Sequence, residues 1–393
     1  MSLAIQALFF VRMLAVGIVA PVLSLMVMAH GATLETLSLL IGLYSATVIA
    51  AEFPSGVLAD LFGQKRAFLL SMLFSMLSFV LILLSRSLWM LTAAMIAMGL
   101  SRAFSSGTLD ALAVNLAQAH DDSALLKITS RFSMLESAGL ALGALLGGVA
   151  AGFGENYIVN ITANIVLYSL LFLGALFFIR QTKPSRADAE HTPLRVLIIG
   201  QVKQSLAFIR QKGVVRAILV LSAATGFALI AIETYWQPTY TAFNPPTWTL
   251  GLVSFIGYTG VMAGAKLITR ILQKHPRHVA FAFLGLRALL GAGLIGLYFT
   301  QGAFSFIGVF MASYFILGGS GVAENTLIHR YVHDDQRSSV LSLFSFVVQI
   351  GGVLASGVGY CISTGGPYKL IWPLAGTLLI LCAVTMLRPS RQI

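Results

Sequence analysis

The sequence predicts an all-α membrane protein with twelve transmembrane helices, arranged as two pseudo-symmetric bundles of six. Three observations carry this prediction: an apolar composition, twelve long apolar segments, and basic residues concentrated in alternate loops. Of the 393 residues, 58% are hydrophobic and 10% are charged, whereas a soluble domain has roughly 25% charged residues. So little charge could not cover the surface of a soluble protein of this size, so we expect lipid to be the solvent for most of the chain.

The spans follow from length and hydropathy. A helix needs about 20 mainly apolar residues to cross about 30 Å of hydrocarbon. Open sheets are excluded in lipid, and the alternating pattern of a β-barrel is absent. We therefore predict helical spans at residues 5–29, 37–59, 67–85, 88–113, 128–153, 158–180, 214–238, 249–272, 279–299, 303–328, 339–363 and 369–388.

The loops between these spans set the topology. Basic pairs such as Lys65 and Arg66 recur in one set of loops, while the alternate set contains Arg86, Lys369 and little else. Loops rich in Lys and Arg stay in the cytoplasm. Both termini are therefore predicted to be cytoplasmic, in a multi-pass protein of the cell (inner, or cytoplasmic) membrane. The net charge of +11 then reflects topology, and nucleic acid is not an expected partner.

The longest loop divides the chain into an N-terminal six-helix bundle (1–185), a cytoplasmic linker (186–213) and a C-terminal six-helix bundle (214–393). Within the linker, residues 194–212 mix apolar and basic positions at helical spacing. This pattern fits an amphipathic helix on the acidic cytoplasmic leaflet, and it also fits a plain tether.

The two halves resemble each other. The tripeptide His120-Asp121-Asp122 follows the fourth span, and His333-Asp334-Asp335 follows the tenth. A glycine-rich span comes after each. This correspondence in a six-plus-six layout supports two parallel repeats.

A loop motif joins the second and third predicted spans. It contains Gly56, Asp60, Gly63, Lys65 and Arg66. The glycines permit a tight turn and a close helix approach, and the acid lies near two bases at a membrane edge.

This stretch resembles the loop signature of the major facilitator superfamily, G-x-L-A-D-R-x-G-R-K, with Leu61 and Gln64 where the family prefers Arg. The resemblance covers essentially the whole chain. It implies two bundles around a central cavity that opens alternately to each side, with the loop acid holding the outward-open state. A topology anchor is the simpler interpretation of the loop.

The fifth span carries the glycines Gly139, Gly143, Gly147 and Gly148. Their pattern resembles the antiporter signature of that family, G-x-x-x-G-P-x-x-G-G, with Ala144 in place of proline. The resemblance implies an exporter. Small residues one turn apart also occur wherever helices pack closely in lipid.

Charged residues within spans are costly and usually face a cavity or a partner. Arg12, Glu52, Arg102 and Glu136 fall in one layer of the first bundle by helical rise. We predict a compensating network that exchanges a proton with the cavity, because burial and a nearby arginine shift a carboxyl pKa in opposite directions. A purely structural set of ion pairs is the alternative.

The second half offers candidate substrate-binding residues. Glu233 stands beside Tyr235 and Trp236, a combination that suits cationic or amphiphilic ligands, although an interfacial aromatic belt has the same composition. Glu324 and Asn325 occupy the inner end of the tenth span and resemble a polar cavity position of related exporters. Arg287, in the ninth span, either snorkels to the interface or reaches a partner such as Glu324.

These observations predict a secondary active transporter and not an enzyme. We expect a proton-coupled antiporter that exports small amphiphilic organic molecules or drugs by alternating access, driven by a gradient, because no nucleotide-binding motif is present. A proton-coupled importer or uniporter of a small polar metabolite is the alternative, and a membrane-embedded enzyme or scaffold is a remote one. The expected partners are substrate, protons and the lipid bilayer, with no cofactor or metal, and the expected state is a monomer.

Overall fold

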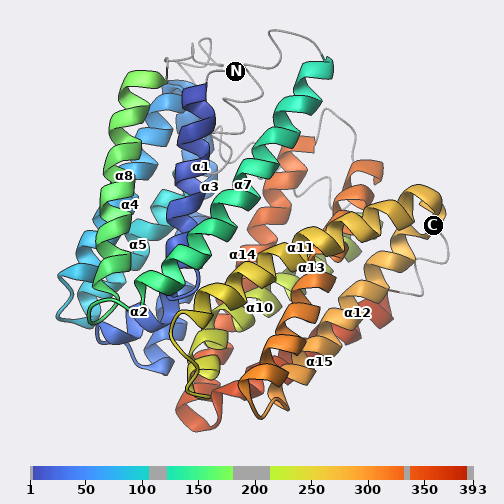
Figure 1. Cartoon of the computed structure of the whole chain (residues 1–393). Helices are drawn as coiled ribbons and strands as arrows, with labels where there is room; N and C mark the ends of the chain where they lie inside the picture. Colours follow the sequence, from blue (N-terminus) through green and yellow to red (C-terminus); the bar gives the residue numbers. More distant parts are fainter. Residues whose placement is uncertain (1–2, 106–121, 180–212, 332–336, 387–393) are drawn as a thin grey trace. The chain divides into compact units, whose positions relative to one another are not determined.

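The structure is a computed structural model that describes residues 3–105, 122–179, 213–331 and 337–386. All regular elements in these ranges are helical, which confirms the predicted fold class (Figure 1). The α-helices are α1 (Leu3–Val19), α2 (Leu23–Ala29), α3 (Leu34–Phe62), α4 (Gln64–Leu83), α5 (Leu88–Ser105), α7 (Asp122–Ala150), α8 (Ile158–Phe178), α10 (Gly213–Thr241), α11 (Thr249–Lys274), α12 (Val279–Tyr298), α13 (Ala303–Tyr331), α14 (Arg337–Gly365) and α15 (Ile371–Thr385). Two 3₁₀ turns, η2 (Pro276–His278) and η4 (Tyr368–Leu370), precede α12 and α15.

Each predicted span coincides with a helix in the described ranges. Ten of these helices are long and apolar enough to cross a membrane, and the bent pair of α1 and α2 makes up to eleven. Within the described side chains of α7, Met134–Ala150 forms a shorter apolar stretch. The predicted linker helix at 194–212 and the repeated His-Asp-Asp tripeptides, apart from Asp122, lie outside the described residues.

The first predicted span is not one straight helix. Helices α1 and α2 meet at an angle of 57° across a break of three residues that contains Pro21. Proline has no backbone N–H to donate and its ring clashes with the preceding turn, so it bends or ends a helix. The hydropathy of the segment predicted the span, but apolar residues continue through the break and could not show the bend.

The chain divides into two compact units. Unit 1 comprises Met1–Thr33, Leu43–Ile199 and Pro246–Phe255, and unit 2 comprises Leu34–Gly42, Gly200–Pro245 and Ile256–Ile393.

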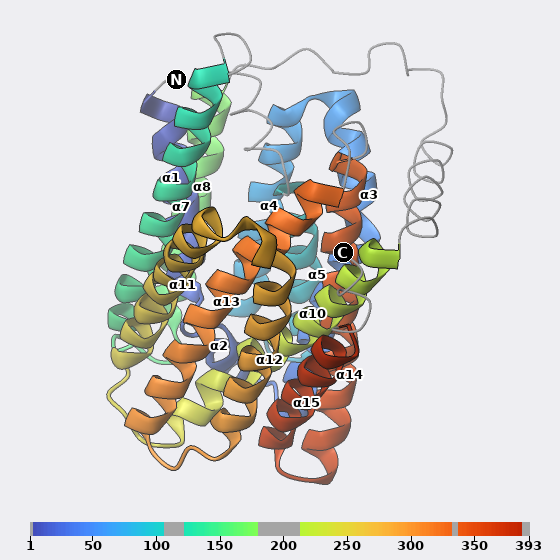
Figure 2. The ribbon, with the colours of Figure 1, turned by 90° about the vertical axis from the view of Figure 1, so that its right-hand side faces the viewer.

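The two units share one packing scheme. In unit 1, α1 packs on α7 and α8, α8 packs on α4, and α4 packs on α5 (Figures 1 and 2). In unit 2, α10 packs on α14 and α15, α15 packs on α12, and α12 packs on α13. Each of these pairs in unit 2 therefore has a counterpart in unit 1, in the same chain order. This equivalence gives the predicted internal repeat a structural basis.

Glycines set the distance between the principal helix pairs. A Cβ atom on Gly226 of α10 would contact the Val348 carbonyl, and one on Gly351 of α14 would contact the Ala223 carbonyl. In α12, a Cβ on Gly291 would lie 2.5 Å from the Gly376 carbonyl of α15. Such contacts are closer than a side chain allows, so glycine lets the helix backbones meet directly and pack closely.

Aromatic side chains fill the interior of unit 2. Trp236 packs against Phe310 at 5.2 Å between ring centroids, and Phe306 stacks on Phe310 at 5.8 Å. The fully buried indole of Trp372 donates from Nε1 to the Ala231 carbonyl over 3.0 Å. These rings fix α10, α13 and α15 around the polar residues that α10 carries.

Candidate functional site

The loop motif between α3 and α4 forms a sharp turn. Gly63 has φ +91° and ψ 147° at the N-cap of α4, a conformation open essentially to glycine. The following Lys65 donates from Nζ to the Leu176 carbonyl at the end of α8 over 2.8 Å. A cation at a helix C-terminus complements the unpaired carbonyls and the helix dipole there. The motif thus ties the α3–α4 turn to α8, while Arg66 is exposed.

Other residues of the motif behave differently. Gly56 lies inside α3, and a Cβ there would meet open space, so the expected close approach of a neighbouring helix is wrong at this position in the described chain. Only the turn at Gly63 requires glycine. Asp60 belongs to the last turns of α3, and its predicted gating role stays a prediction.

The antiporter-like glycines of α7 form the contact surface for α1. A Cβ on Gly139 would lie 2.7 Å from the Met13 Cβ, and one on Gly143 would lie 2.8 Å from the Gly17 Cα. Gly147 continues the row against Ile18. The last residue, Gly148, meets Gly251 of α11 within the same unit, at 2.6 Å from such a Cβ to the Gly251 Cα.

A buried asparagine locks this interface. Asn160 of α8 is fully buried and donates from Nδ2 to the Ile18 carbonyl over 3.1 Å and to the Gly147 carbonyl over 2.9 Å. One side chain thereby joins α1, α7 and α8. Sequence reasoning missed it, because a lone asparagine in an apolar span carries no signal of its partners.

The charged residues of unit 1 come from four helices. Arg12 of α1 is buried and its charge acts on the Tyr168 phenol of α8, whereas Arg102 of α5 is exposed and acts on the Tyr44 phenol of α3. Glu52 of α3 is half-buried and Glu136 of α7 is exposed. The predicted proton-exchange network of Arg12, Glu52, Arg102 and Glu136 stays a prediction.

Glu233 in unit 2 is an acid set among aromatic rings. Glu233 is exposed, although its neighbours on this stretch of α10 are largely buried. The Tyr314 hydroxyl of α13 donates to the carboxylate, and Trp236 supplies a further side-chain hydrogen bond. Tyr258 of α11 lies within electrostatic range of Glu233.

The two aromatic residues next to Glu233 are placed differently from it. Tyr235 and Trp236 are 1% and 2% exposed. The Tyr235 hydroxyl lies 3.1 Å from Ser363 Oγ of α14, and its ring stacks on Tyr368 at 5.4 Å. Trp236 still hydrogen-bonds Glu233, and Tyr314 and Tyr258, which the sequence analysis did not identify, are further aromatic residues around this acid.

A second acid forms a buried ion pair. Arg287 of α12 donates from Nη2 to Glu324 Oε2 of α13 over 2.6 Å, and Ser222 of α10 donates to the other carboxylate oxygen. The two charged side chains are 2% and 17% exposed, respectively. Of the two positions expected for Arg287, pairing with Glu324 is therefore confirmed. Asn325, the next residue, is exposed.

Arg287 depends on this one carboxylate. Its Nε and Nη1 groups are buried, and no hydrogen-bond acceptor among the described residues reaches them. The Phe283 ring lies 5.5 Å from the guanidinium carbon and gives a weaker cation–π contact. Protonation of Glu324 would leave a buried positive charge without its counter-ion, a state that costs several kcal/mol.

The two acids lie at different depths. Ser222, which contacts Glu324, precedes Glu233 by 11 residues on α10, a separation of about 16 Å along a helix. The two acids therefore lie at different levels along α10. Among the described residues, no group of three or more His, Cys, Asp or Glu could hold a metal ion.

Comparison with known proteins gives concordant results. A family model described as Major Facilitator Superfamily matches residues 7–356. An uncharacterised MFS-type transporter of Bacillus subtilis (strain 168), YxaM, is 23% identical over 382 residues, which cover 94% of this chain and 91% of that protein.

Solved structures show the same fold. The nucleoside transporter NupG, as its D323A mutant, superposes with a TM-score of 0.77 at 11% identity and covers 98% of both chains. A POT family transporter in complex with a thioalcohol-conjugated peptide gives a TM-score of 0.73 at 14% identity, covering 99% of this chain and 96% of that one.

Proposed function

Since the chain belongs to the major facilitator superfamily and is therefore a multi-pass secondary transporter, we propose that it is a proton-coupled antiporter. In this proposal it exports small amphiphilic organic molecules, with organic cations as the preferred class. The observation that carries the proposal is the solvent-accessible carboxylate of Glu233, hydrogen-bonded by Tyr314 and flanked by further aromatic rings. A carboxylate among aromatic faces attracts an organic cation by charge and by cation–π contact.

The ion pair of Arg287 and Glu324 provides the proton step of the proposed cycle. When Glu324 is ionised, it compensates the buried guanidinium. When it accepts a proton, the compensation is lost and the packing of α12 and α13 around Arg287 becomes unfavourable. A proton can thus shift the balance between two conformations, because a ligand shifts an equilibrium by its differential affinity for the two states.

Unit 1 contributes a second candidate proton site. Glu52 and Glu136 belong to the same unit as Arg12 and Arg102. In the proposed network, burial would disfavour the charged form of a carboxyl group and a nearby arginine would favour it. The proposal also includes a gating role for the loop motif and an exporter role for the antiporter-like glycines. It places both termini in the cytoplasm, in a protein of the cell membrane that works as a monomer. Asn325, exposed beside Glu324, is the proposed polar contact at the inner end of the substrate path.

The proposal is tested by proton movement in everted membrane vesicles. A panel of lipophilic cations and neutral drugs is added, and internal pH is followed with a fluorescent dye. The wild-type protein should release protons on addition of lipophilic cations. Glu233→Gln should raise the concentration of cation needed for half-maximal release at least tenfold, because an ionic contact is lost.

Three further variants separate coupling from binding. Glu324→Gln, Glu52→Gln and Glu136→Gln should identify the coupling acid by loss of proton release while cation binding persists. Glu155→Gln, in the loop between α7 and α8, removes one exposed acid from outside these sites and should behave as wild type. Uptake of a polar metabolite with proton entry, or substrate movement without proton movement, would contradict antiport and support an importer or a uniporter.

A further inference from the structure

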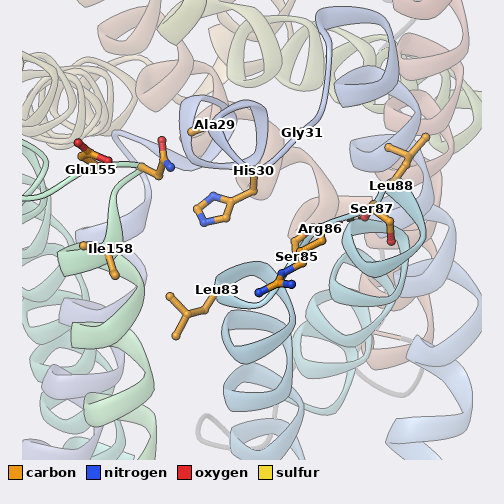
Figure 3. Close-up of a pocket in the computed structure, with 11 residues that line it drawn as sticks. Ala29, His30, Gly31, Leu83, Ser85, Arg86, Ser87, Leu88, Glu155 and Ile158 are labelled. Carbon is orange, nitrogen blue, oxygen red and sulfur yellow. Dashed lines mark hydrogen bonds between the residues drawn. The ribbon is translucent and has the colours of Figure 1, made fainter.

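Unit 1 contains a cavity that the transport proposal does not use. It has a volume of about 810 Å³ and lies between the loops that follow α2, α4 and α7 (Figure 3). Ligand pockets in proteins typically measure about 300–1,000 Å³. All its lining residues belong to unit 1, and the three loops belong to the set that carries few basic residues. On the topology predicted from the loops, the cavity opens at the outer face of the membrane.

One side of the cavity is basic. The Arg86 guanidinium and the His30 imidazole reach the same space from neighbouring loops (Figure 3). His30 Nδ1 lies 2.8 Å from the Met26 carbonyl, so Nδ1 carries a hydrogen and the other ring nitrogen is left to the cavity. Arg86 therefore offers hydrogen bonds to an anionic group such as a phosphate, while the second ring nitrogen of His30, which carries no hydrogen in this tautomer, can accept a hydrogen bond.

The opposite side is acidic. Glu155 lies across the cavity, in the loop between α7 and α8 (Figure 3). The following residue, Asn156, also lines the cavity. No ion pair joins Arg86 or Glu155 to an oppositely charged residue in the described ranges. The two charges therefore face one space without neutralising each other.

The acidic loop is held in an uncommon conformation. Gly154, Asn156 and Tyr157 have φ of +76°, +51° and +61°. Residues other than glycine rarely adopt this region, and such strain persists where the surrounding structure fixes it. The loop thus presents Glu155 and Asn156 in a defined orientation and not as a flexible tether.

Apolar residues complete the lining. Leu83 and Ile158 lie on the side of the cavity formed by the ends of α4 and α8 (Figure 3). Trp89 and Phe153, adjacent in sequence to lining or loop residues, are 82% and 63% exposed. Exposed aromatic rings at helix ends are typical of the membrane–water interface. The cavity therefore combines a polar interior with an apolar margin at the level of lipid headgroups.

We propose that this cavity binds a zwitterion that carries a phosphate and a primary ammonium group, the headgroup chemistry of an aminophospholipid. Arg86 holds the phosphate, Glu155, Asn156 and the second ring nitrogen of His30 accept hydrogen bonds from the ammonium group, and Leu83 and Ile158 contact the glycerol and the first acyl carbons. A quaternary ammonium group has no hydrogen to donate, so Glu155 distinguishes phosphatidylethanolamine from phosphatidylcholine.

Native mass spectrometry of the detergent-solubilised full-length protein tests the site. The protein is titrated with phosphatidylethanolamine, phosphatidylcholine and phosphatidylglycerol of identical acyl chains. Phosphatidylethanolamine should be retained at least fivefold better than the other two. Arg86→Gln should reduce retention of phosphatidylethanolamine at least fivefold, and Glu155→Gln should abolish the preference over phosphatidylcholine.

Lys369→Gln is the matched control, since it removes a cation from another loop of the poorly basic set, outside the cavity. This variant should retain the wild-type preference. Equal retention of the three lipids by the wild-type protein, or unchanged preference in both pocket variants, would overturn the proposal. A soluble arm identifies the source of the ligand: stabilisation of the wild type, but not of Arg86→Gln, by phosphoethanolamine alone would assign the same chemistry to a free zwitterion.

Discussion

Arg287 and Glu324 form an ion pair over 2.6 Å inside unit 2, and the two partners are unequally accessible: the guanidinium is 2% exposed and the carboxylate 17%. The carboxylate is thus the more accessible of the two partners. Loss of its charge would leave the guanidinium without a counter-ion, which is costly for a buried charge.

Removal of one partner of this pair should be more harmful than removal of both. Glu324→Ala leaves the buried guanidinium uncompensated and should lower stability by about 3–5 kcal/mol. The double variant Arg287→Met with Glu324→Leu should recover most of that loss, while proton coupling at this site stays absent. Thermal unfolding of the purified proteins in detergent measures both effects. A double variant no more stable than Glu324→Ala would contradict the dependence of Arg287 on this carboxylate.

Two glycines of the sequence motifs should respond oppositely to alanine. Gly143→Ala places a Cβ into the Leu14 carbonyl of α1 and should force α1 and α7 apart, with a clear fall in melting temperature. Gly56→Ala meets open space and should stabilise α3 by up to about 1 kcal/mol, because alanine favours helix more than glycine does. Melting curves followed by size-exclusion chromatography distinguish the two, and equal effects would argue against the α1–α7 contact.

The turn at Gly63 should not tolerate a side chain. Gly63→Ala requires an alanine at φ +91°, and a strained backbone of this kind costs about 1–3 kcal/mol. Gly302→Ala is the control, because that loop glycine has open space around it and no positive φ. Thermal stability should fall in the first variant only. A neutral Gly63→Ala would mean that the α3–α4 turn takes a different conformation.

The two buried asparagines of α8 should differ in importance. Asn160→Ala removes two hydrogen bonds, to α1 and to α7, and should cost about 1–3 kcal/mol through their loss and the loss of packing. Asn164→Ala loses a bond from Nδ2 to the Asn160 carbonyl of its own helix and should cost less. Comparison of the two melting temperatures decides, and the reverse order would contradict the bridging role of Asn160.

Tyr314→Phe tests the aromatic acid site without removing its ring. The variant loses the hydroxyl that donates to Glu233 and keeps the surface available for a cation–π contact. Affinity for a lipophilic cation should change by less than tenfold, whereas Tyr314→Ala should weaken it further, since the ring supplies roughly 0.5–2 kcal/mol. Binding is measured by tryptophan fluorescence quenching. Identical losses in the two variants would assign the effect to the hydroxyl and not to the ring.

Several features of the fold were predictable because they depend on local properties. Hydropathy gave the helical spans, and the loop motif predicted a glycine turn, which Gly63 forms at φ +91°. The bend at Pro21 and the open space at Gly56 were not predicted, because the first depends on where the chain resumes its helix and the second on what packs nearby. For the charged residues, position in the sequence indicated how deep in the membrane each one lies. It did not indicate toward which neighbouring helix each side chain points.

The sequence by itself determined that this chain is a helical membrane protein, because long apolar segments can satisfy their backbone groups in lipid only as helices. It also indicated which residues were too polar to face hydrocarbon. The tertiary structure decided their partners: Arg287 meets Glu324 and Ser222, and Glu233 meets Tyr314, across helices far apart in sequence. Those contacts depend on how each helix is rotated and how closely glycines let it approach its neighbour, and such information arises only when the helices pack.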